Sequence, residues 1–155
     1  MTTNQKGAIA EAAIALEAIK LGVEVNRPLA EGGRYDLIFG LEDELLRVQC
    51  KWAAQRGNVL VVPYVSCWRS GGGFVRRTYT RTEIDGIAAY SPDLDRCFFV
   101  PIDRVEGKPA IRLRITPTRN NQQRGINWAE DFDLAATLAR HGAVAQLGEQ
   151  RAGSA

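Results

Sequence analysis

The sequence contains few of the residues from which disulfide frameworks, zinc sites and histidine-based catalytic centres are built. Its three cysteines, Cys50, Cys67 and Cys97, are odd in number and widely spaced, which argues against a disulfide framework and against paired zinc ligands. The single histidine, His141, lies near the C-terminal end. We therefore expect a reduced, cytoplasmic protein whose chemistry does not depend on a histidine or a disulfide.

Long apolar runs and a strong excess of one charge are also missing. No run approaches the roughly 20 residues that a membrane span needs, and the first residues lack the charged-then-apolar pattern of a signal peptide. The net charge of +2 does not by itself identify a partner. The 45% hydrophobic and 25% charged content is ordinary for a globular protein. We expect one domain over residues 1–140 and a flexible tail over residues 141–155.

The hydrophobic pattern predicts an α/β fold. Residues 5–21 consist mainly of good helix formers and precede Gly22, which indicates a helix. Apolar or alternating segments bounded by turn residues predict strands at 23–26, 35–41, 44–52, 59–65, 74–80, 97–102 and 111–115. A capping box from Thr82 predicts a short helix over 82–91, and Asn127 with Glu130 predicts a last helix through His141. The expected architecture is a mixed β-sheet flanked by helices.

Polar residues cluster on the hairpin that segments 35–41 and 44–52 would form. If residues 42 and 43 make a two-residue loop, Asp36 lies directly opposite Gln49. Lys51 is two residues further along and therefore shares that face of the strand. The alternative is an ordinary solvated hairpin face, and a register shift of one residue would separate the groups.

A carboxylate on the first predicted helix belongs with this cluster. Glu11 has small and apolar neighbours one turn away, among them Ala8, Ile14 and Ala15, so burying it requires a partner or a metal. A helix packed over the hairpin would point Glu11 at Asp36. Carboxylate and amide oxygens suit Mg²⁺, and a lysine beside the metal stabilises a phosphate under attack. Glu11, Asp36 and Gln49 are thus candidate metal ligands, with Lys51 completing a set for phosphodiester hydrolysis.

These motifs together resemble the PD-(D/E)XK nucleases. The resemblance rests on the K-G-x-x-x-E pattern that begins at Lys6, on YDL at residues 35–37 and on VQCKW at residues 48–52. Among these nucleases the chain is most similar to the group I intron-encoded homing endonucleases of bacterial transfer-RNA introns. The wider resemblance runs through TEIDGIAAYSPDLDRCFFVPI and RNNQQ and so covers most of residues 5–135.

The resemblance implies a restriction-endonuclease-like core, Mg²⁺-dependent double-strand cleavage and assembly of small subunits on a long DNA site. A homo-tetramer is favoured, and a dimer is the alternative. The family's four motif positions correspond to Glu11, Asp36, Gln49 and Lys51. Gln49 stands where the family name has an acidic residue, and the residues before Asp36 lack the proline.

Two further segments have the composition of DNA-binding elements. Residues 67–81 carry no acidic residue, interleave aromatic with basic side chains, and predict a β-ribbon whose arginines contact phosphates or reach into a groove. A second group combines arginines with consecutive amides, which suit guanine and adenine edges respectively. The alternatives are a solvated edge hairpin and a polar turn. The candidate DNA-binding residues are Arg69, Arg76, Arg77, Arg81, Arg112, Arg114, Arg119, Asn120, Asn121, Gln122, Gln123 and Arg124.

Three functions fit these observations. The leading hypothesis is a homing enzyme that cuts double-stranded DNA at a specific site with Mg²⁺. The second is a structure-selective nuclease, such as a junction resolvase, or a restriction-type enzyme on the same core. The third is a catalytically silent DNA-binding or intron-associated protein, which the neutral Gln49 favours.

Overall fold

The first helix, α1, is fixed at its start by local hydrogen bonds and along its length by a narrow buried stripe. The computed structural model describes residues 1–141, apart from the side chains of Trp68 and Arg69, so the predicted flexible tail lies almost wholly outside the described residues. α1 spans Thr3–Lys20, and Thr2 and Gln5 form a reciprocal capping box before it. Ala10, Ile14 and Ala18 are its buried residues.

Five strands form the central mixed sheet, in the order β1-β2-β3-β8-β9. All neighbours pair antiparallel except β3 and β8, which run parallel. The strands are β1 (Glu24–Asn26), β2 (Leu37–Gly40), β3 (Leu45–Trp52), β8 (Gly86–Ser91) and β9 (Arg96–Pro101). The predicted mixed α/β sheet is therefore confirmed.

The hairpin register is the one that a two-residue loop predicts. Leu37 pairs with Val48 and Gly40 pairs with Leu45. The Leu41 amide donates to the Glu44 carbonyl at 2.9 Å, which closes the loop. Continuing the same register one residue beyond β2 places Asp36 opposite Gln49.

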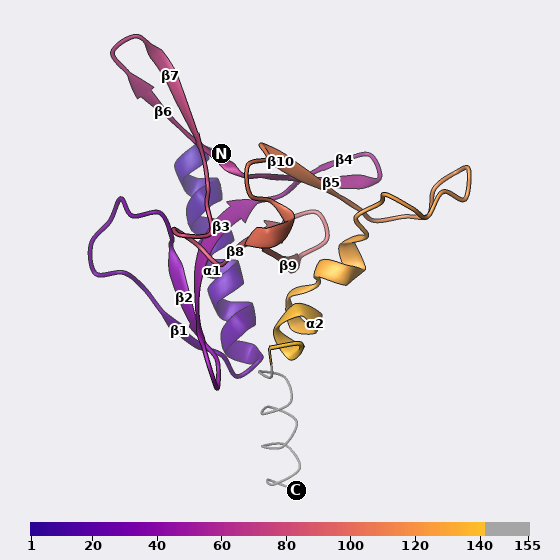
Figure 1. The fold of residues 1–155 in the computed structure, drawn as a ribbon, viewed down its shortest axis with the longest axis horizontal. Coiled ribbons are helices and arrows are strands. Elements are labelled where there is room, and N and C mark those ends of the chain that lie inside the picture. The colour runs from indigo at the N-terminus through magenta and orange to yellow at the C-terminus, as the bar shows by residue number, and fades with distance from the viewer. Residues whose placement is uncertain (142–155) are drawn as a thin grey trace, which may run out of the picture.

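Two smaller sheets stand beside the central sheet (Figure 1). One has the order β10-β5-β4, from Ala110–Arg114, Val59–Pro63 and Ala54–Arg56. The other is a ribbon of β6 (Val65–Ser70) and β7 (Gly73–Thr78), which projects away from the rest of the chain (Figure 1). The predicted β-ribbon is therefore present.

The two faces of the central sheet are covered differently. On one face, α1 and the short helix α2 (Leu134–Ala139) pack through Ile14 and Leu138 into a core that includes Phe39. On the other face, a second core joins Ile87 of β8 to the small sheet, for example to Leu60. The 3-10 helices η1 (Ile102–Arg104) and η2 (Ala129–Phe132) contribute to this second core. Helices thus cover one face of the sheet and a second sheet covers the other.

The predicted helices at residues 82–91 and 127–141 need correction. The capping box predicted from Thr82 does not form, because Asp85 instead accepts hydrogen bonds from Arg47. The turn here is closed by Glu83, whose carboxylate accepts from the Thr80 amide at 3.2 Å. The chain then enters β8, whose buried apolar residues fill the space beside β3. At the C-terminal end, Asp133 rather than Asn127 caps α2, accepting from the Ala136 amide. Core packing decided these segments against local helix signals.

None of the helices in the described part of the chain is long and apolar enough to cross a membrane.

Candidate active site

Asp36 lies immediately before β2 and is held by the strand opposite it. Its amide donates to the Val48 carbonyl at 2.9 Å. Its Oδ2 accepts hydrogen bonds from Gln49 Nε2 at 2.8 Å and from the Cys50 amide at 2.9 Å. Oδ1 accepts from no residue in the described part of the chain, so this oxygen is available to a ligand.

Lys51 lies in the same cleft as Asp36 and Gln49. This cleft, of about 760 Å³, is bounded by the β2–β3 hairpin on one side and by the foot of the ribbon on the other, including Val65 and Arg77. Lys51 Nζ donates to the Val65 carbonyl at 3.4 Å. The structure therefore brings together three of the four predicted catalytic residues and sets them beside the predicted DNA-binding ribbon.

Glu11 approaches Asp36 from α1, but in an adjoining cleft. Glu11, Arg27 and Asp36 line a pocket of about 240 Å³ that Lys51 does not reach. Arg27 pairs with Glu11 at 2.9 Å, with 26% of the Glu11 side chain exposed. Asp36 lines both clefts, together with Gly32 and Gly33. Glu11 thus faces Asp36 as the packing of a helix over the hairpin predicts.

Burial shapes the electrostatics of the two carboxylates. It raises the pKa of Asp36, which the Cys50 amide and the Lys51 ammonium only partly oppose. Burial likewise raises the pKa of Glu11, with Arg27 lowering it and the Asp36 charge adding to the rise. A cation bound between these two carboxylates would favour their ionised forms.

The donor set fits a hard divalent cation if the amide takes part. Among residues 1–141, no three His, Cys, Asp or Glu side chains gather closely enough to hold a metal. Glu11, Asp36 and the Gln49 oxygen together supply oxygen ligands of the kind that Mg²⁺ prefers. Gln49 presently turns its nitrogen to Asp36, so ligation would require its amide to present the opposite end.

Cys50 and His141 have no place in this chemistry. Burial raises the pKa of the Cys50 thiol well above its ordinary value, so the thiol stays protonated. His141 contacts Glu44, beside the loop that closes the opposite end of the hairpin. That neither residue is catalytic remains a prediction.

The ribbon arginines are in different environments. Arg76 and Arg77 lie on β7 and are exposed, and Arg77 pairs with Glu83 at 3.0 Å. Arg69 lies on β6, but its side chain is outside the described residues. Arg81 follows the ribbon and is already paired with Glu106 at 3.0 Å.

The second predicted DNA-binding group divides between β10 and the loop after it. Arg112 and Arg114 lie on β10. The loop carrying Arg119, Asn120, Asn121, Gln122, Gln123 and Arg124 is exposed and projects from the body (Figure 1). Inside the loop, the Gln122 backbone amide donates to Asn120 Oδ1 at 3.2 Å, and Gln122 Nε2 donates to the Arg124 carbonyl at 3.2 Å. Both side chains therefore make contacts within the loop.

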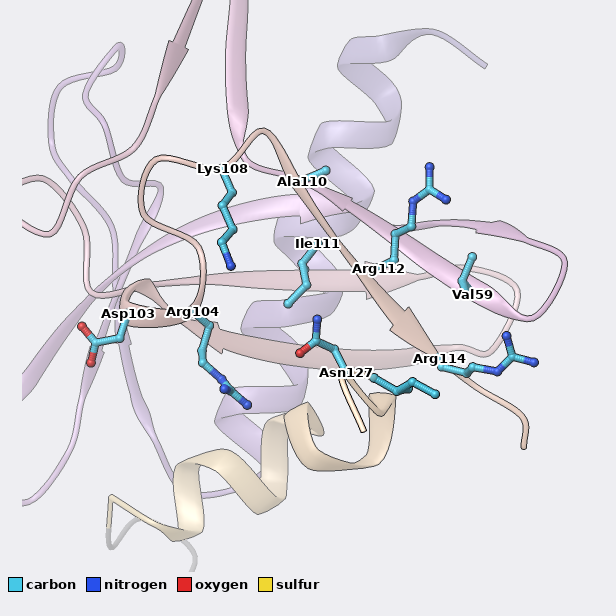
Figure 2. Close-up of a pocket in the computed structure, with 11 residues that line it drawn as sticks. Val59, Asp103, Arg104, Lys108, Ala110, Ile111, Arg112, Arg114 and Asn127 are labelled. Atoms are coloured by element: carbon cyan, nitrogen blue, oxygen red, sulfur yellow. The ribbon is translucent and has the colours of Figure 1, made fainter. Parts of the chain in front are cut away.

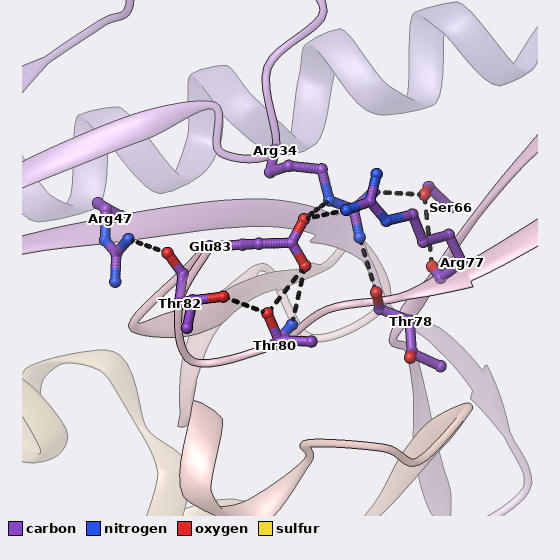
Figure 3. A network of polar contacts seen from close by, with 8 residues as sticks. All are labelled: Arg34, Arg47, Ser66, Arg77, Thr78, Thr80, Thr82 and Glu83. Carbon is purple, nitrogen blue, oxygen red and sulfur yellow. Dashed lines mark hydrogen bonds and ion pairs between the residues drawn. The ribbon is translucent and has the colours of Figure 1, made fainter.

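Sequence reasoning missed a group of residues that hold the cleft together. Arg34 donates to Glu83 at 2.6 Å, to Ser66 at 2.8 Å and to the Thr78 carbonyl at 2.8 Å (Figure 3). Its guanidinium also lies 4.1 Å from the centre of the Tyr79 ring. The only signal was the unusual Arg34 two residues before Asp36, because its partners are distant in sequence.

Comparisons with known proteins place this geometry in a family. A family model described as PD-(D/E)XK endonuclease matches residues 1–135. The structure of a bacterial homing endonuclease, I-Ssp6803I, matches with a TM-score of 0.71 and 26% sequence identity. That match covers 97% of this chain and 99% of the other. A search of curated proteins gave no match. The nuclease resemblance and the fold class predicted from sequence are confirmed.

Proposed function

Because this chain belongs to the PD-(D/E)XK endonuclease family, we propose that it is a homing-type endonuclease that cuts double-stranded DNA at a specific site with Mg²⁺. The observation that carries the proposal is the cleft shared by Asp36, Gln49 and Lys51 at the foot of the basic ribbon. The similarity to a bacterial homing endonuclease over nearly the whole chain supports the homing type. A gene carried in a group I intron remains a prediction from the sequence resemblance.

The reaction is hydrolysis of a phosphodiester. Water adds to phosphorus, one phosphorus–oxygen ester bond breaks, and the proton lost by the water balances the proton taken up by the leaving alcohol. Mg²⁺, when held by Glu11, Asp36 and the Gln49 oxygen, lowers the pKa of a bound water and neutralises charge on the phosphate. Cleavage of both strands requires two such sites or two successive encounters.

The side chains of the cleft have separate tasks. Asp36 keeps its Oδ1 open toward the ligand, because Oδ2 is occupied by Gln49 and Cys50. The Lys51 ammonium, anchored to the Val65 carbonyl, places a positive charge where the phosphate gains negative charge. The exposed Arg76 and Arg77, the arginines of β10 and the amide-rich loop would hold the duplex through its phosphates and base edges.

One observation favours a second candidate. Gln49 directs its nitrogen, not its oxygen, at Asp36, and a neutral amide is a weaker ligand than a carboxylate. A catalytically silent DNA-binding or intron-associated protein would keep this fold and this hydrogen bond. A structure-selective or restriction-type nuclease would use the same cleft on a different DNA.

A cleavage assay separates these functions. The protein would be incubated with a randomised duplex library, a four-way junction and a plasmid, each with Mg²⁺ or with EDTA. We expect Mg²⁺-dependent cutting at one long sequence recovered from the library. Selective cutting of the junction would support the structure-selective alternative, and a short selected site would support a restriction-type enzyme. Duplex binding without cutting in any metal would support the silent protein.

A further inference from the structure

A basic cleft lies beside the small sheet, apart from the candidate active site. Its volume is about 470 Å³, and Arg104, Lys108, Arg112 and Arg114 contribute to its lining (Figure 2). The one carboxylate in the lining, Asp103, is directed outward and pairs with Arg81 at 3.5 Å (Figure 2). The cleft therefore carries a local excess of positive charge, although the whole chain carries only +2.

Most of these cations lack an anionic partner. Arg114 is committed to the loop, donating to the Thr116 carbonyl at 2.8 Å and to the Pro117 carbonyl at 3.2 Å. Arg104 stacks 5.4 Å from the Phe132 ring centre and makes no hydrogen bond to a described residue. The side chains of Lys108 and Arg112 have no hydrogen bond or ion pair within the part of the chain that the structure describes. A cleft lined by charges of one sign raises the local concentration of anions.

The cleft is joined to the foot of the ribbon. Arg81, just past the ribbon, donates to Glu106 from its amide at 2.7 Å and from Nε at 3.0 Å. The Tyr64 amide, just before the ribbon, donates to the Pro109 carbonyl at 2.8 Å. Lys108 lies between these two anchors in sequence. An extended polyanion that lies along the ribbon would meet the cleft at the ribbon's foot.

We propose that this cleft binds the phosphate backbone of the DNA, with Lys108, Arg104 and Arg112 as contacts to its phosphates. The proposal rests on the proposed function for its substrate, and it adds two residues that sequence reasoning did not select, Arg104 and Lys108. Phosphate contacts of this kind fix the position of a duplex without reading its sequence.

The test compares two lysines. The salt dependence of binding to a random duplex would be measured for wild type, Lys108→Ala and Lys20→Ala. Lys20 is also exposed but lies at the end of α1. We expect Lys108→Ala to weaken binding and to reduce the slope of log K against log salt by about 0.9, with Lys20→Ala unchanged. Identical behaviour of the two variants would overturn the proposal.

A second arm separates the cleft from the proposed function. Inorganic phosphate would be titrated into the ¹⁵N-labelled protein, following the amides of Gly125, Ile126 and Asn127, which line the cleft. If wild type binds no duplex, the proposed function fails and the DNA assignment of the cleft fails with it. Phosphate-dependent shifts that Lys108→Ala abolishes would in that case show a site for free phosphate instead.

An independent observation concerns Tyr79, the first residue after the ribbon. Only 4% of it is exposed, and two cations lie near its ring. Arg34 Cζ is 4.1 Å from the ring centre and Lys51 Nζ is 5.3 Å from it. Both cations also bind the ribbon itself: Arg34 through Ser66 and Thr78, and Lys51 through the Val65 carbonyl. The loop that ends at Asp36 and the lysine of the cleft thus hold the same ribbon foot.

Glu83 completes this arrangement. Burial acts to raise its pKa, but hydrogen bonds from Thr80 and the Arg34 guanidinium hold it below its ordinary value, so Glu83 stays ionised. The Arg34 guanidinium therefore donates to one charged partner, Glu83, and to two neutral partners, Ser66 and the Thr78 carbonyl, in three fixed directions (Figure 3). A lysine could satisfy the charge but not the three directions.

We infer that Arg34 and Tyr79 are positioning residues that couple the DNA-bound ribbon to the placement of Lys51 and Asp36. Their effect falls on the chemical step, since neither reaches out to the duplex. The inference rests on the proposed function. Arg34 lies only 22% exposed and Tyr79 is buried, so neither is available as a phosphate contact.

Single-turnover cleavage and duplex affinity would be measured for Arg34→Ala, Arg34→Lys, Tyr79→Phe and Tyr79→Leu. We expect Arg34→Ala and Tyr79→Leu to slow cleavage by about tenfold or more, as small misplacement of reacting groups does, with affinity changed less than about twofold. Tyr79→Phe keeps the ring and should cut like wild type, and Arg34→Lys should recover only part of the rate.

The inference would be overturned if Arg34→Ala and Tyr79→Leu lost duplex affinity in parallel with cleavage rate. It would also be overturned if Tyr79→Phe cleaved DNA more slowly than wild type. Measurements well below each variant's unfolding midpoint exclude a trivial loss of folded protein. A wild type that cuts no DNA would instead contradict the proposed function itself.

Discussion

At the scale of single residues, Asp36 is the best-defined part of the site. Its backbone continues the β2–β3 register, and its Oδ2 is saturated by two donors while Oδ1 faces the cleft. Lys51 is placed by its strand and by the ribbon. These are the residues whose replacement should affect chemistry without removing the DNA-binding surface.

Asp36→Asn and Lys51→Ala should each abolish detectable cleavage while leaving duplex binding largely intact. Removing an indirect partner of a catalytic metal costs about 10- to 100-fold in activity, and Asp36 would be a direct ligand, so we expect a larger loss. Cleavage kinetics and a gel-shift assay on the same duplex would measure the two effects. Normal cutting by Asp36→Asn in Mg²⁺ would remove Asp36 from the mechanism.

The raised pKa of Asp36 also predicts a pH-dependent stability difference. A carboxyl with a raised folded-state pKa destabilises the folded chain as pH rises through that pKa, because the buried group must ionise. Asp36→Asn should therefore have a higher Tm than wild type at neutral pH in EDTA, and the gap should close in acid.

Mg²⁺ should reduce the difference in Tm between Asp36→Asn and wild type. It should raise the Tm of wild type but not that of Asp36→Asn, because a ligand that binds only the folded state stabilises it. Asp43→Asn, at the exposed tip of the hairpin, is the control and should match wild type throughout. A Tm for Asp36→Asn that is equal to or below that of wild type in EDTA at neutral pH would contradict the burial argument.

At the scale of elements, the ribbon and the central sheet have different roles. The ribbon is exposed, with Arg76 and Arg77 side by side on β7. The central sheet is rigidly packed, and β8 is buried beside the strand that carries Gln49 and Lys51. Changes in the ribbon should alter binding, and changes in β8 should alter stability.

Arg76→Ala with Arg77→Ala should weaken binding to specific and random duplexes equally. Each lost phosphate contact reduces the slope of log K against log salt by about 0.9, so the pair should reduce it by roughly 1 to 2. Titrations at several salt concentrations on both duplexes would show this. A loss confined to the specific site would mean that these arginines read bases.

Gly86→Ala should destabilise the sheet, because a Cβ there would lie 2.3 Å from Phe99 Cζ and 2.9 Å from the Val100 carbonyl oxygen. Overpacking of this kind costs about 1–3 kcal/mol in the free energy of unfolding. The control is Gly7→Ala in α1, where a Cβ meets nothing within 4 Å. Replacing that helical glycine should stabilise by about 0.5–1 kcal/mol. Denaturant midpoints that shift in the same direction would contradict the packing argument.

At the scale of the whole molecule, the ribbon and the exposed loop after β10 project from different parts of the body (Figure 1). The candidate active site lies at the foot of the ribbon. One chain of 155 residues can contact only a limited length of DNA. A homing enzyme needs a long site, and symmetric oligomers present the same surface more than once to a roughly palindromic target.

We therefore predict at least a homodimer, and favour a homo-tetramer in which two subunits cut and the others brace them. Light scattering with and without duplex DNA would measure the assembly. A strict monomer that cuts both strands in one encounter would contradict the prediction and much of the homing hypothesis.

Much of the site was predictable because it depends on short-range pairing. A two-residue loop fixes which residues of a hairpin face one another, so the sequence alone placed Asp36 opposite Gln49 and Lys51 on the same face. The helix α1 and the ribbon also follow from local composition and from the glycines that end or turn them. The sequence by itself thus determined the fold class, the hairpin and its three polar groups.

Only the tertiary structure decided how distant segments meet. Local signals favoured a helix at residues 82–91, but burial beside β3 made it a parallel strand. Glu11 approaches Asp36 from a different element, and the three contacts of Arg34 are with residues far away in the chain. Arg104 and Lys108 meet in one cleft although the segment that carries them is irregular. No periodicity encodes such contacts, because they depend on how sheets and helices pack and not on the local preferences of any one segment.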